Sequence, residues 1–298
     1  MKKGLLLALF CILIDFSFGQ TMLDLSGDYF GQTAPQDKPL IFGDDYVSTS
    51  GIEHSSPTFS LDGDELYWSK IVISNDSVFQ LIMCSKRISG NWTKPTIAPF
   101  SKERLYEGGL IISADNKRLY FYRGQPAAVN KDVESNEIIC YSKKGNQWVN
   151  PKVICSGFSP SVTNNGTIYF DSDEGISKIS FNDGKMASIQ LLDDKINLKG
   201  YKNWTPYIAP DESYLIFSRL DYNGDYGELM ISFRNIKTGV WSEPINMGSP
   251  INTWAQERFP SVTQDGKYLF FTRWTQNNNQ DIFWVSSEVI ERLKEKTE

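Results

Sequence analysis

Short runs of hydrophobic residues flank an Asp-Gly pair near the C-terminal end of the chain. The clearest case is RFPSVTQDGKYLFFTR, residues 258–273. Two such runs joined by an Asp-Gly turn are typical of a β-hairpin. Similar stretches recur upstream, and the turn residues are Asp62, Asp115, Asn165, Asp211 and Asp265. A strand-rich pattern that returns about every 50 residues predicts a repeat architecture.

Each hairpin is followed by a third strand-like run, and in most repeats by a fourth. The third runs are residues 79–87, 137–143, 227–234 and 281–286. The fourth run begins at a Trp-x-x-Pro motif, found at residues 92–95, 148–151 and 241–244 but not in the third repeat. Proline is tolerated there because an edge strand does not use every backbone N–H. Four antiparallel strands per repeat predict the blade of a β-propeller, an all-β fold.

The last repeat has no fourth run of its own, since a short helix over residues 287–294 is expected after its third run. Residues 39–47 (PLIFGDDYV) precede the first hairpin as the proline-led runs precede the later hairpins. We therefore predict that this N-terminal strand pairs with the last blade and closes a ring of five blades, which leaves no long exposed sheet edge between them. The alternative, six blades, requires a further repeat that the sequence does not contain.

Several of these stretches resemble a known family of repeats. PTFSLDG, PSVTQDGKYLFFTR and the succession ELMISFR, GVWSEPIN, INT and ERFPSV are similar to the TolB-like, or PD40 (WD40-like), propeller repeats of exported bacterial proteins. The likeness extends from Pro39 to the C-terminus, although Asn116, Asn165 and Glu212 depart from the Asp-Gly turn. It implies a propeller fold, which in that family serves for protein interaction or as a domain fused to a peptidase.

The N-terminus predicts export. Met1, Lys2 and Lys3 precede a hydrophobic run over residues 5–14, and Ser17 and Gly19 are small residues at the positions that a signal peptidase reads. We expect a signal peptide over residues 1–19, cut before Gln20, then an irregular segment over 20–38 and a single propeller domain over 39–298, in the periplasm or secreted. The run is too short to span a membrane, and Phe beside Cys11 argues against lipoprotein processing.

Charge and composition narrow the possible partners and chemistry. The net charge of −6 argues against nucleic acid, which needs a clustered basic face. His54 is the single histidine, too few for a His-rich metal site, and no G-x-S-x-G motif occurs. An odd number of cysteines remains after cleavage, namely Cys84, Cys140 and Cys155, so buried free thiols are expected. We expect a monomer without catalytic residues, metal or cofactor.

Charged residues at the strand ends form the candidate site. Residues before the first strand and after the second strand of each hairpin share one face of the ring, and the first strand lines the axial channel. The expected members are Glu53 with Lys70, Glu107 with Arg123, Trp204 with Arg219, Glu257 with Arg273, and also His54 and Asp171. Two interpretations stay open: salt bridges within each blade, or a shallow polar mouth that grips a carboxylate or sugar acid. Arg258 should point away from Glu257, because successive strand residues alternate faces.

These features predict a binding module that recognises a protein or glycan of the cell envelope through the loops at one mouth. The alternative is a glycoside-hydrolase-like enzyme, which needs two carboxylates about 5 to 9.5 Å apart. Two unpaired carboxylates in an open pocket would favour the enzyme. A mouth closed by Glu–Arg pairs would favour the module.

Overall fold

The computed structural model describes residues 22–129, 131, 136–182, 185–221, 227–275 and 279–296. Within these ranges the chain is all β, apart from a short 3-10 helix, η1 (Asp28–Gly31), and the C-terminal helix α1 (Glu288–Glu295). The expected signal peptide, residues 1–19, lies outside the described residues. No helix in the described ranges is long and apolar enough to cross a membrane.

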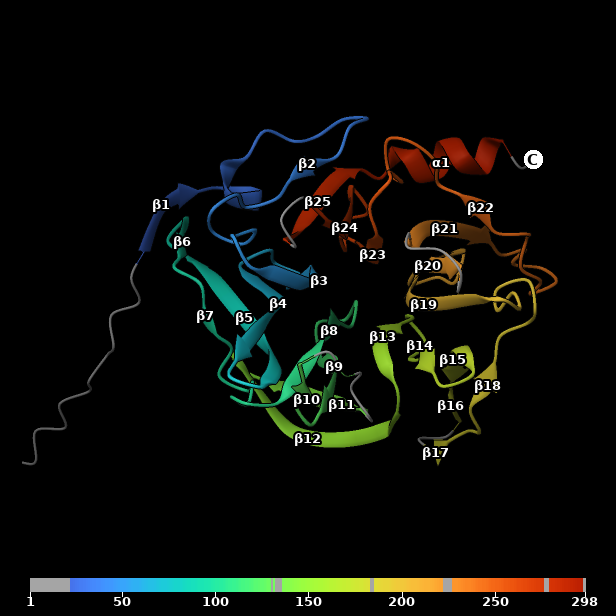
Figure 1. Ribbon diagram of the computed structural model, residues 1–298, viewed down its shortest axis with the longest axis horizontal. Coiled ribbons are helices and arrows are strands. Elements are labelled where there is room, and N and C mark those ends of the chain that lie inside the picture. The colour runs from blue at the N-terminus through green and yellow to red at the C-terminus, as the bar shows by residue number, and fades with distance from the viewer. Residues whose placement is uncertain are drawn as a thin grey trace, which may run out of the picture.

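Most strands pair in antiparallel sets of four that surround a central axis, with β3, β8, β13, β19 and β23 innermost (Figure 1). In pairing order, the first set is β3 (Ile52–Phe59), β4 (Glu65–Ser74), β5 (Ser77–Ile88) and β7 (Thr96–Ile97), and the second is β8 (Tyr106–Ile112), β9 (Arg118–Gly124), β11 (Asn136–Lys144) and β12 (Gln147–Ser156). The third set is β13 (Phe158–Val162), β14 (Ile168–Ser172), β15 (Gly175–Ile179) and β18 (Gln190–Leu191), and the fourth is β19 (Tyr201–Ile208), β20 (Tyr214–Asp221), β21 (Gly227–Phe233) and β22 (Ile245–Asn246). The last set is β23 (Glu257–Val262), β24 (Tyr268–Trp274), β25 (Gln280–Ser286) and β2 (Leu40–Ile41). This radial arrangement of antiparallel sheets is that of a β-propeller.

The N-terminal strand supplies the outer strand of the last set. Leu40 pairs with Trp284 and Ile41 with Phe283, both antiparallel. The next residue continues the contact, since the Phe42 N–H donates to the Ile282 carbonyl at 2.8 Å. The pairing predicted for residues 39–47 is therefore observed at β2. It places an N-terminal strand beside the last set, as the neighbouring positions of β2 and β25 in Figure 1 show.

The segment before β2 is more ordered than the sequence predicts. We expected residues 20–38 to be irregular, but β1 (Met22–Ser26) pairs with the short strand β6 (Asn91–Thr93). The Trp92 indole N–H donates to the Gly27 carbonyl at 2.9 Å, and Phe30 is buried against that ring. The segment thus packs against the first set, and burial of Phe30 stabilises this contact.

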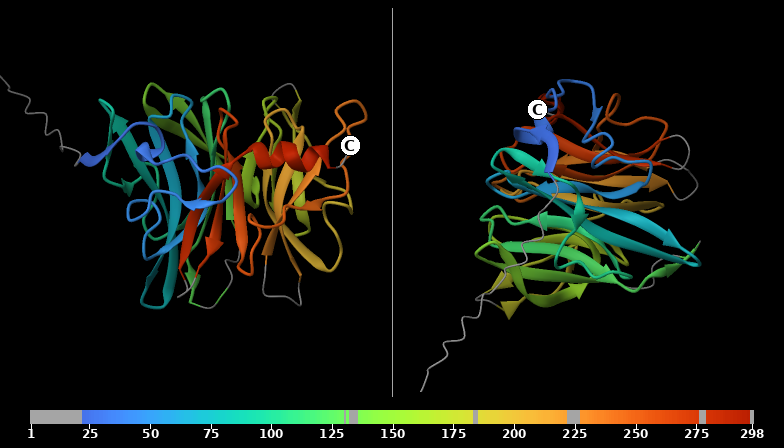
Figure 2. Two further views of the ribbon diagram at one scale, coloured as in Figure 1. Left: turned by 90° about the horizontal axis from the view of Figure 1, so that it is seen from above. Right: turned by 90° about the vertical axis from the view of Figure 1, so that its left-hand side faces the viewer.

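Hydrophobic clusters fill the spaces between neighbouring sets. The cluster between the last and first sets joins Trp284 and Phe270 to Trp68, with Phe30 and Phe42 of the N-terminal segment. A second cluster lies between the fourth and fifth sets, and α1 covers it from outside (Figure 2). The core is therefore divided among the contacts between sets rather than gathered at the axis.

Smaller elements complete the described chain. Strand β10 (Ala127–Ala128) pairs with β5, and β16 (Phe181–Asn182) pairs with β17 (Lys185–Met186).

The cysteines Cys84, Cys140 and Cys155 are free thiols, of which Cys84 is buried and the other two are half-buried. Burial raises the pKa of each thiol, which lowers the fraction of reactive thiolate.

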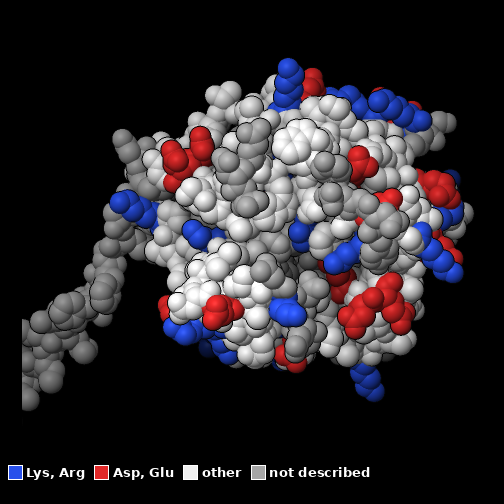
Figure 3. Space-filling view, viewed as in Figure 1, with Lys and Arg blue, Asp and Glu red and all other residues white. Residues whose placement is uncertain are grey.

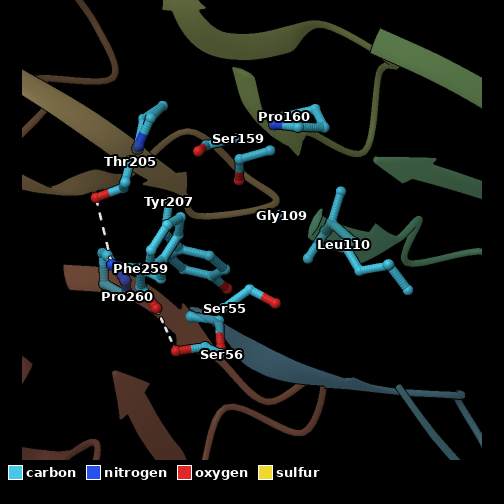
Figure 4. A pocket seen from close by; sticks show the side chains of 14 residues that line it. Ser55, Ser56, Gly109, Leu110, Ser159, Pro160, Thr205, Tyr207, Phe259 and Pro260 are labelled. Carbon is cyan, nitrogen blue, oxygen red and sulfur yellow. Dashed lines mark hydrogen bonds between the residues drawn. The ribbon is translucent and has the colours of Figure 1, made fainter. Parts of the chain in front are cut away.

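A β-bulge recurs in the first strands next to the axis. The registers shift just after Gly108, Phe158, Trp204 and Arg258. The following residues have positive φ angles: Gly109 (61°), Ser159 (47°), Thr205 (49°) and Phe259 (51°). These bulges surround a cavity of about 30 Å³, shown in Figure 4, where Thr205 accepts from the Phe259 N–H and Ser56 donates to the Phe259 carbonyl. A bulge re-aims the neighbouring side chains, here those at the axis.

Candidate functional site

The charged residues at the strand ends form contacts within each set. Arg123 Nε donates to Glu107, and Arg273 Nε donates to Glu257 at 2.8 Å. The side chains of both glutamates are fully buried, at 0 % exposure. Lys70 stands opposite Glu53 in register. Side chains with these partners hold the strand ends together.

The arginines of these contacts also bind the loop that enters the same set. Arg273 Nη2 donates to the carbonyls of Pro250 and Ile251, at 3.2 and 2.8 Å. Arg219 Nη2 donates in the same way to Lys195 and Ile196, both at 3.0 Å. We call these side chains the arginine clamps: Arg123, Arg219 and Arg273. The repeated arrangement is what the first interpretation, salt bridges within each blade, leads one to expect.

In the fourth set the clamp has a neutral partner. We expected Trp204 to face Arg219, but Arg219 pairs in register with Asn203, and its Nε donates to Asn203 Oδ1 at 2.7 Å. Trp204 stands opposite Ser218 instead. A shift of one residue moves a side chain to the other face of a strand, so Trp204 lies on the face opposite to the clamp.

Asp171 differs from the expectation for the same reason. It pairs with Phe158, as Ser218 pairs with Trp204 and Thr272 with Arg258. It therefore occupies the position that precedes the clamp arginine in other sets. Its carboxyl group faces the axis, together with the side chains that alternate with the clamp residues.

A cavity of about 790 Å³ lies at this end of the axis. The first strands of all the sets contribute to its wall or to the wall of the narrow cavity below it, and the principal side chains are His54, Tyr106, Tyr122, Phe158, Asp171, Lys202, Trp204 and Arg258. Of the expected site residues, His54, Asp171 and Trp204 line the cavity, whereas Glu53, Lys70, Glu107, Arg123, Arg219, Glu257 and Arg273 do not. Sequence reasoning missed Tyr106, Tyr122, Lys202 and Arg258 as site residues.

Polar atoms in this cavity wall lack hydrogen-bond partners. They are buried atoms of residues on four different strands: His54 Nδ1, Asp171 Oδ1, Trp204 Nε1 and Arg258 Nε. Buried polar groups in proteins are nearly always hydrogen-bonded, because an unmade bond costs about 1 to 3 kcal/mol. The residues that carry these buried atoms all lie in the wall of one ligand-sized cavity, which makes that cavity the candidate binding site.

Two cations contact the ring of Trp204. The Arg258 guanidinium carbon lies 3.8 Å from the Trp204 ring centroid, and Lys202 Nζ lies 4.1 Å from it. Contacts of this length are favourable cation–π interactions. Because both contacts are made by the protein's own cations, the ring positions Arg258 and Lys202.

Enclosure of the cavity shifts the pKa values of its ionisable groups. Burial raises the pKa of Asp171 to about 7, although hydrogen bonds from the Thr205 backbone and the Ser159 side chain lower it. Burial lowers the pKa of Arg258 to about 10. Burial, and secondarily the charge of Arg258, lowers the pKa of His54 well below its usual value. Every shift favours the neutral form, as expected where water is excluded.

These shifts lead us to expect a pH-dependent stability. Asp171 and Glu53 both have pKa values of about 7, above those of the unfolded chain, and burial is the main cause in each case. At these two groups the folded protein retains protons that the unfolded chain releases, which lowers stability as the pH rises from about 4 to about 7. The lowered pKa of His54 acts in the opposite direction up to about pH 6.5, where the unfolded imidazole loses its proton, but it is one group against two. We expect a higher melting temperature at about pH 5 than at about pH 8.

Substitution can assign this dependence to its groups. The Asp171→Asn and Glu53→Gln variants should each have a flatter profile of melting temperature against pH. Asp265→Asn is the control, because hydrogen bonds lower the pKa of Asp265 despite its partial burial, and it titrates below this range. A wild-type slope retained in both test variants would contradict the assignment.

Charges of both signs are spread over the face of the molecule shown in Figure 3. No continuous basic patch crosses that face.

The chain matches no protein-family profile and no curated protein sequence.

Solved structures with similar folds are distant in sequence. A structure assigned to TolB from Agrobacterium tumefaciens is 14 % identical over 76 % of this chain and 72 % of its own, with a TM-score of 0.43. An engineered GH43 glycoside hydrolase with endo-xylanase and exo-arabinofuranosidase activity is 12 % identical, with a TM-score of 0.49. The similarity covers 83 % of this chain and 51 % of that enzyme.

Prolyl oligopeptidase B from Galerina marginata is 14 % identical, with a TM-score of 0.40. The similarity covers 80 % of this chain but only 32 % of the peptidase. The chain thus corresponds to about half of the glycoside hydrolase and a third of the peptidase. Because each TM-score is below 0.5, the assignment of a β-propeller rests on the strand pairing itself.

Proposed function

We propose that the protein is an exported β-propeller of five blades, one for each strand set, and that it binds a glycan or peptide segment in the cavity at one end of its axis. The observation that carries this proposal is that residues with unpaired polar atoms meet in the wall of a cavity of about 790 Å³. A cavity of this size is typical of small-molecule and cofactor sites. The proposed partner belongs to the cell envelope, and the propeller is the single domain over residues 39–298.

The carboxylates of the cavity favour binding over glycoside hydrolysis. Asp171 is the enclosed carboxyl group, while Asp173 and Glu174 are exposed on the turn that follows it in the chain. A hydrolase needs a second carboxylate across the sugar from the first. The first-strand positions that face the cavity from other sets carry His54, Trp204 and Arg258 instead. The pKa of Asp171, about 7, suits a general acid and keeps hydrolysis as the second candidate.

Binding and hydrolysis can be measured on the same protein. We expect the chain from Gln20 onward to bind members of a glycan and peptide array and to leave aryl glycosides intact. Asp171→Asn should weaken the binding about 10- to 100-fold, because it removes the acidic partner of a charge-assisted hydrogen bond. Asp76→Asn is the matched control, since Asp76 is exposed and does not line the cavity.

Two results would contradict the proposal. One is turnover of a glycoside that Asp171→Asn abolishes while binding persists, which would identify the enzyme. The other is equal binding by the wild type and Asp171→Asn, which would move the site away from the cavity.

A further inference from the structure

We infer that the cavity selects a carboxylate-bearing ligand of the sugar-acid class, with Arg258 as the group that binds the carboxylate. The inference rests on the proposed binding function and adds the chemistry of the ligand. It is carried by the contrast between Arg258 and the arginine clamps.

Arg258 has no acidic partner among the described residues. Its guanidinium makes no salt bridge and no side-chain hydrogen bond there, and its Nε atom is inaccessible to solvent. Arg123 and Arg273 each bind a buried glutamate, and Arg219 binds Asn203 and loop carbonyls. An enclosed charge without a partner is costly, so such a group is typical of a site whose partner is a ligand.

The orientation of Arg258 is fixed by aromatic rings. Its guanidinium carbon lies 3.8 Å from the centroid of Trp204 and 5.1 Å from that of Phe259. The aromatic rings contact the flat face of the Arg258 guanidinium, whereas its N–H donors point outward in the plane of the group. A planar guanidinium held in this way offers two parallel donors to a carboxylate. Lys202, at the Trp204 ring, adds a second positive charge to this part of the wall.

The same cavity holds groups suited to the hydroxyls of a sugar. The carboxyl group of Asp171 already accepts hydrogen bonds from Thr205 and Ser159, but its buried Oδ1 atom has no donor, and His54 Nδ1 is a buried ring nitrogen without a partner. A small shift of these side chains would turn both atoms toward a ligand. Asp171 and Arg258 form no salt bridge with each other, although each affects the pKa of the other. Two opposite charges left apart in one cavity suit a ligand that carries a carboxylate and hydrogen-bond donors together. Tyr106 and Tyr122 form the aromatic backing of this part of the wall, at 8 % and 2 % exposure.

The test compares two sugars that differ at a single carbon. D-glucuronate carries a carboxylate where D-glucose carries a hydroxymethyl group. Calorimetric titration should detect binding of D-glucuronate or D-galacturonate to the chain from Gln20. The affinity for the matching neutral sugar should be lower by a factor of about 10 or more. Arg258→Gln should reduce the affinity for the uronate about 10- to 100-fold and leave that for the neutral sugar unchanged.

Two measurements guard against loss of folding in the variant. The melting temperature of Arg258→Gln should change little, because removal of an enclosed charge without a salt bridge offsets the loss of its cation–π contacts. Arg104→Gln is the matched control, since it removes the same charge at an exposed position outside the cavity and should bind like the wild type.

The outcomes separate this inference from the proposed function. If array binding is observed but neither uronate binds better than its neutral sugar, the binding function stands and the carboxylate inference fails. If a uronate binds through Arg258 but no array member binds, the carboxylate inference stands and the proposal of a glycan or peptide partner is rejected. Equal uronate binding by the wild type and Arg258→Gln also overturns the role of Arg258.

Discussion

A chain that begins at Val47 should aggregate or lose most of its stability. The deletion removes β2, which pairs with β25, and leaves the backbone edge of the last set open. It also removes Phe30 and Phe42 from the cluster that joins the last set to the first. Loss of a buried phenylalanine costs about 3 to 5 kcal/mol, against a total stability of about 5 to 15 kcal/mol for a typical domain. Size-exclusion chromatography and urea unfolding, each compared with the chain from Gln20, measure the effect.

A single substitution tests the same closure without changing the chain length. Phe42, the residue after β2, is fully buried, while Leu40 in β2 is 44 % exposed. Phe42→Ala should therefore cost about 3 to 5 kcal/mol, and Leu40→Ala should have little effect. Equal melting temperatures for the wild type, the deletion and Phe42→Ala would show that closure at β2 does not stabilise the ring.

The arrangement of the strands could be predicted because its signals are local. Asp-Gly turns and the repeated Trp-x-x-Pro motif lie within single repeats, so their structural consequences do not depend on distant residues. The pairing of residues 39–47 with the last set followed from comparison of the repeats alone. Burial of Phe30 could not be predicted in this way, because Trp92, its partner, lies far along the chain.

Two of the expected site residues, Trp204 and Asp171, do not lie with the clamps as the alignment of the repeats predicted. Alignment on the turns placed Trp204 and Asp171 one position out of register with the clamps, and bulges in the first strands make such an offset invisible in the sequence. The orientation of Arg258 away from Glu257 agrees with strand alternation. What alternation could not show is that this direction leads into a cavity, which requires side chains from distant repeats to converge. Reading the first-strand residues one position further in every repeat would have found it.

Removing a clamp arginine should destabilise the protein according to the charge of its partner. Arg273→Ala and Arg123→Ala leave Glu257 and Glu107 buried without a cation, so each should cost about 3 to 5 kcal/mol. Arg219→Ala is the matched comparison, since its partner Asn203 is neutral while its contacts to two loop carbonyls resemble those of Arg273. Its loss should be smaller, about 1 to 3 kcal/mol, because only uncharged acceptors lose a donor. Urea unfolding of the three variants measures these differences.

The double variant Glu257→Gln/Arg273→Ala separates two causes of instability: the buried Glu257 carboxylate left without a cation, and the lost packing of the Arg273 side chain. Without the carboxylate, the stability of this variant should recover part of the difference between Arg273→Ala and Arg219→Ala. A lower pH should also restore stability to Arg273→Ala, because it protonates Glu257, whose pKa burial already raises. Loss of Arg273, the cation beside it, should raise that pKa further, so the effect of Arg273→Ala should shrink as the pH falls toward about 5. If the three single variants lose equal stability at every pH, the buried carboxylates do not determine the contribution of the clamps.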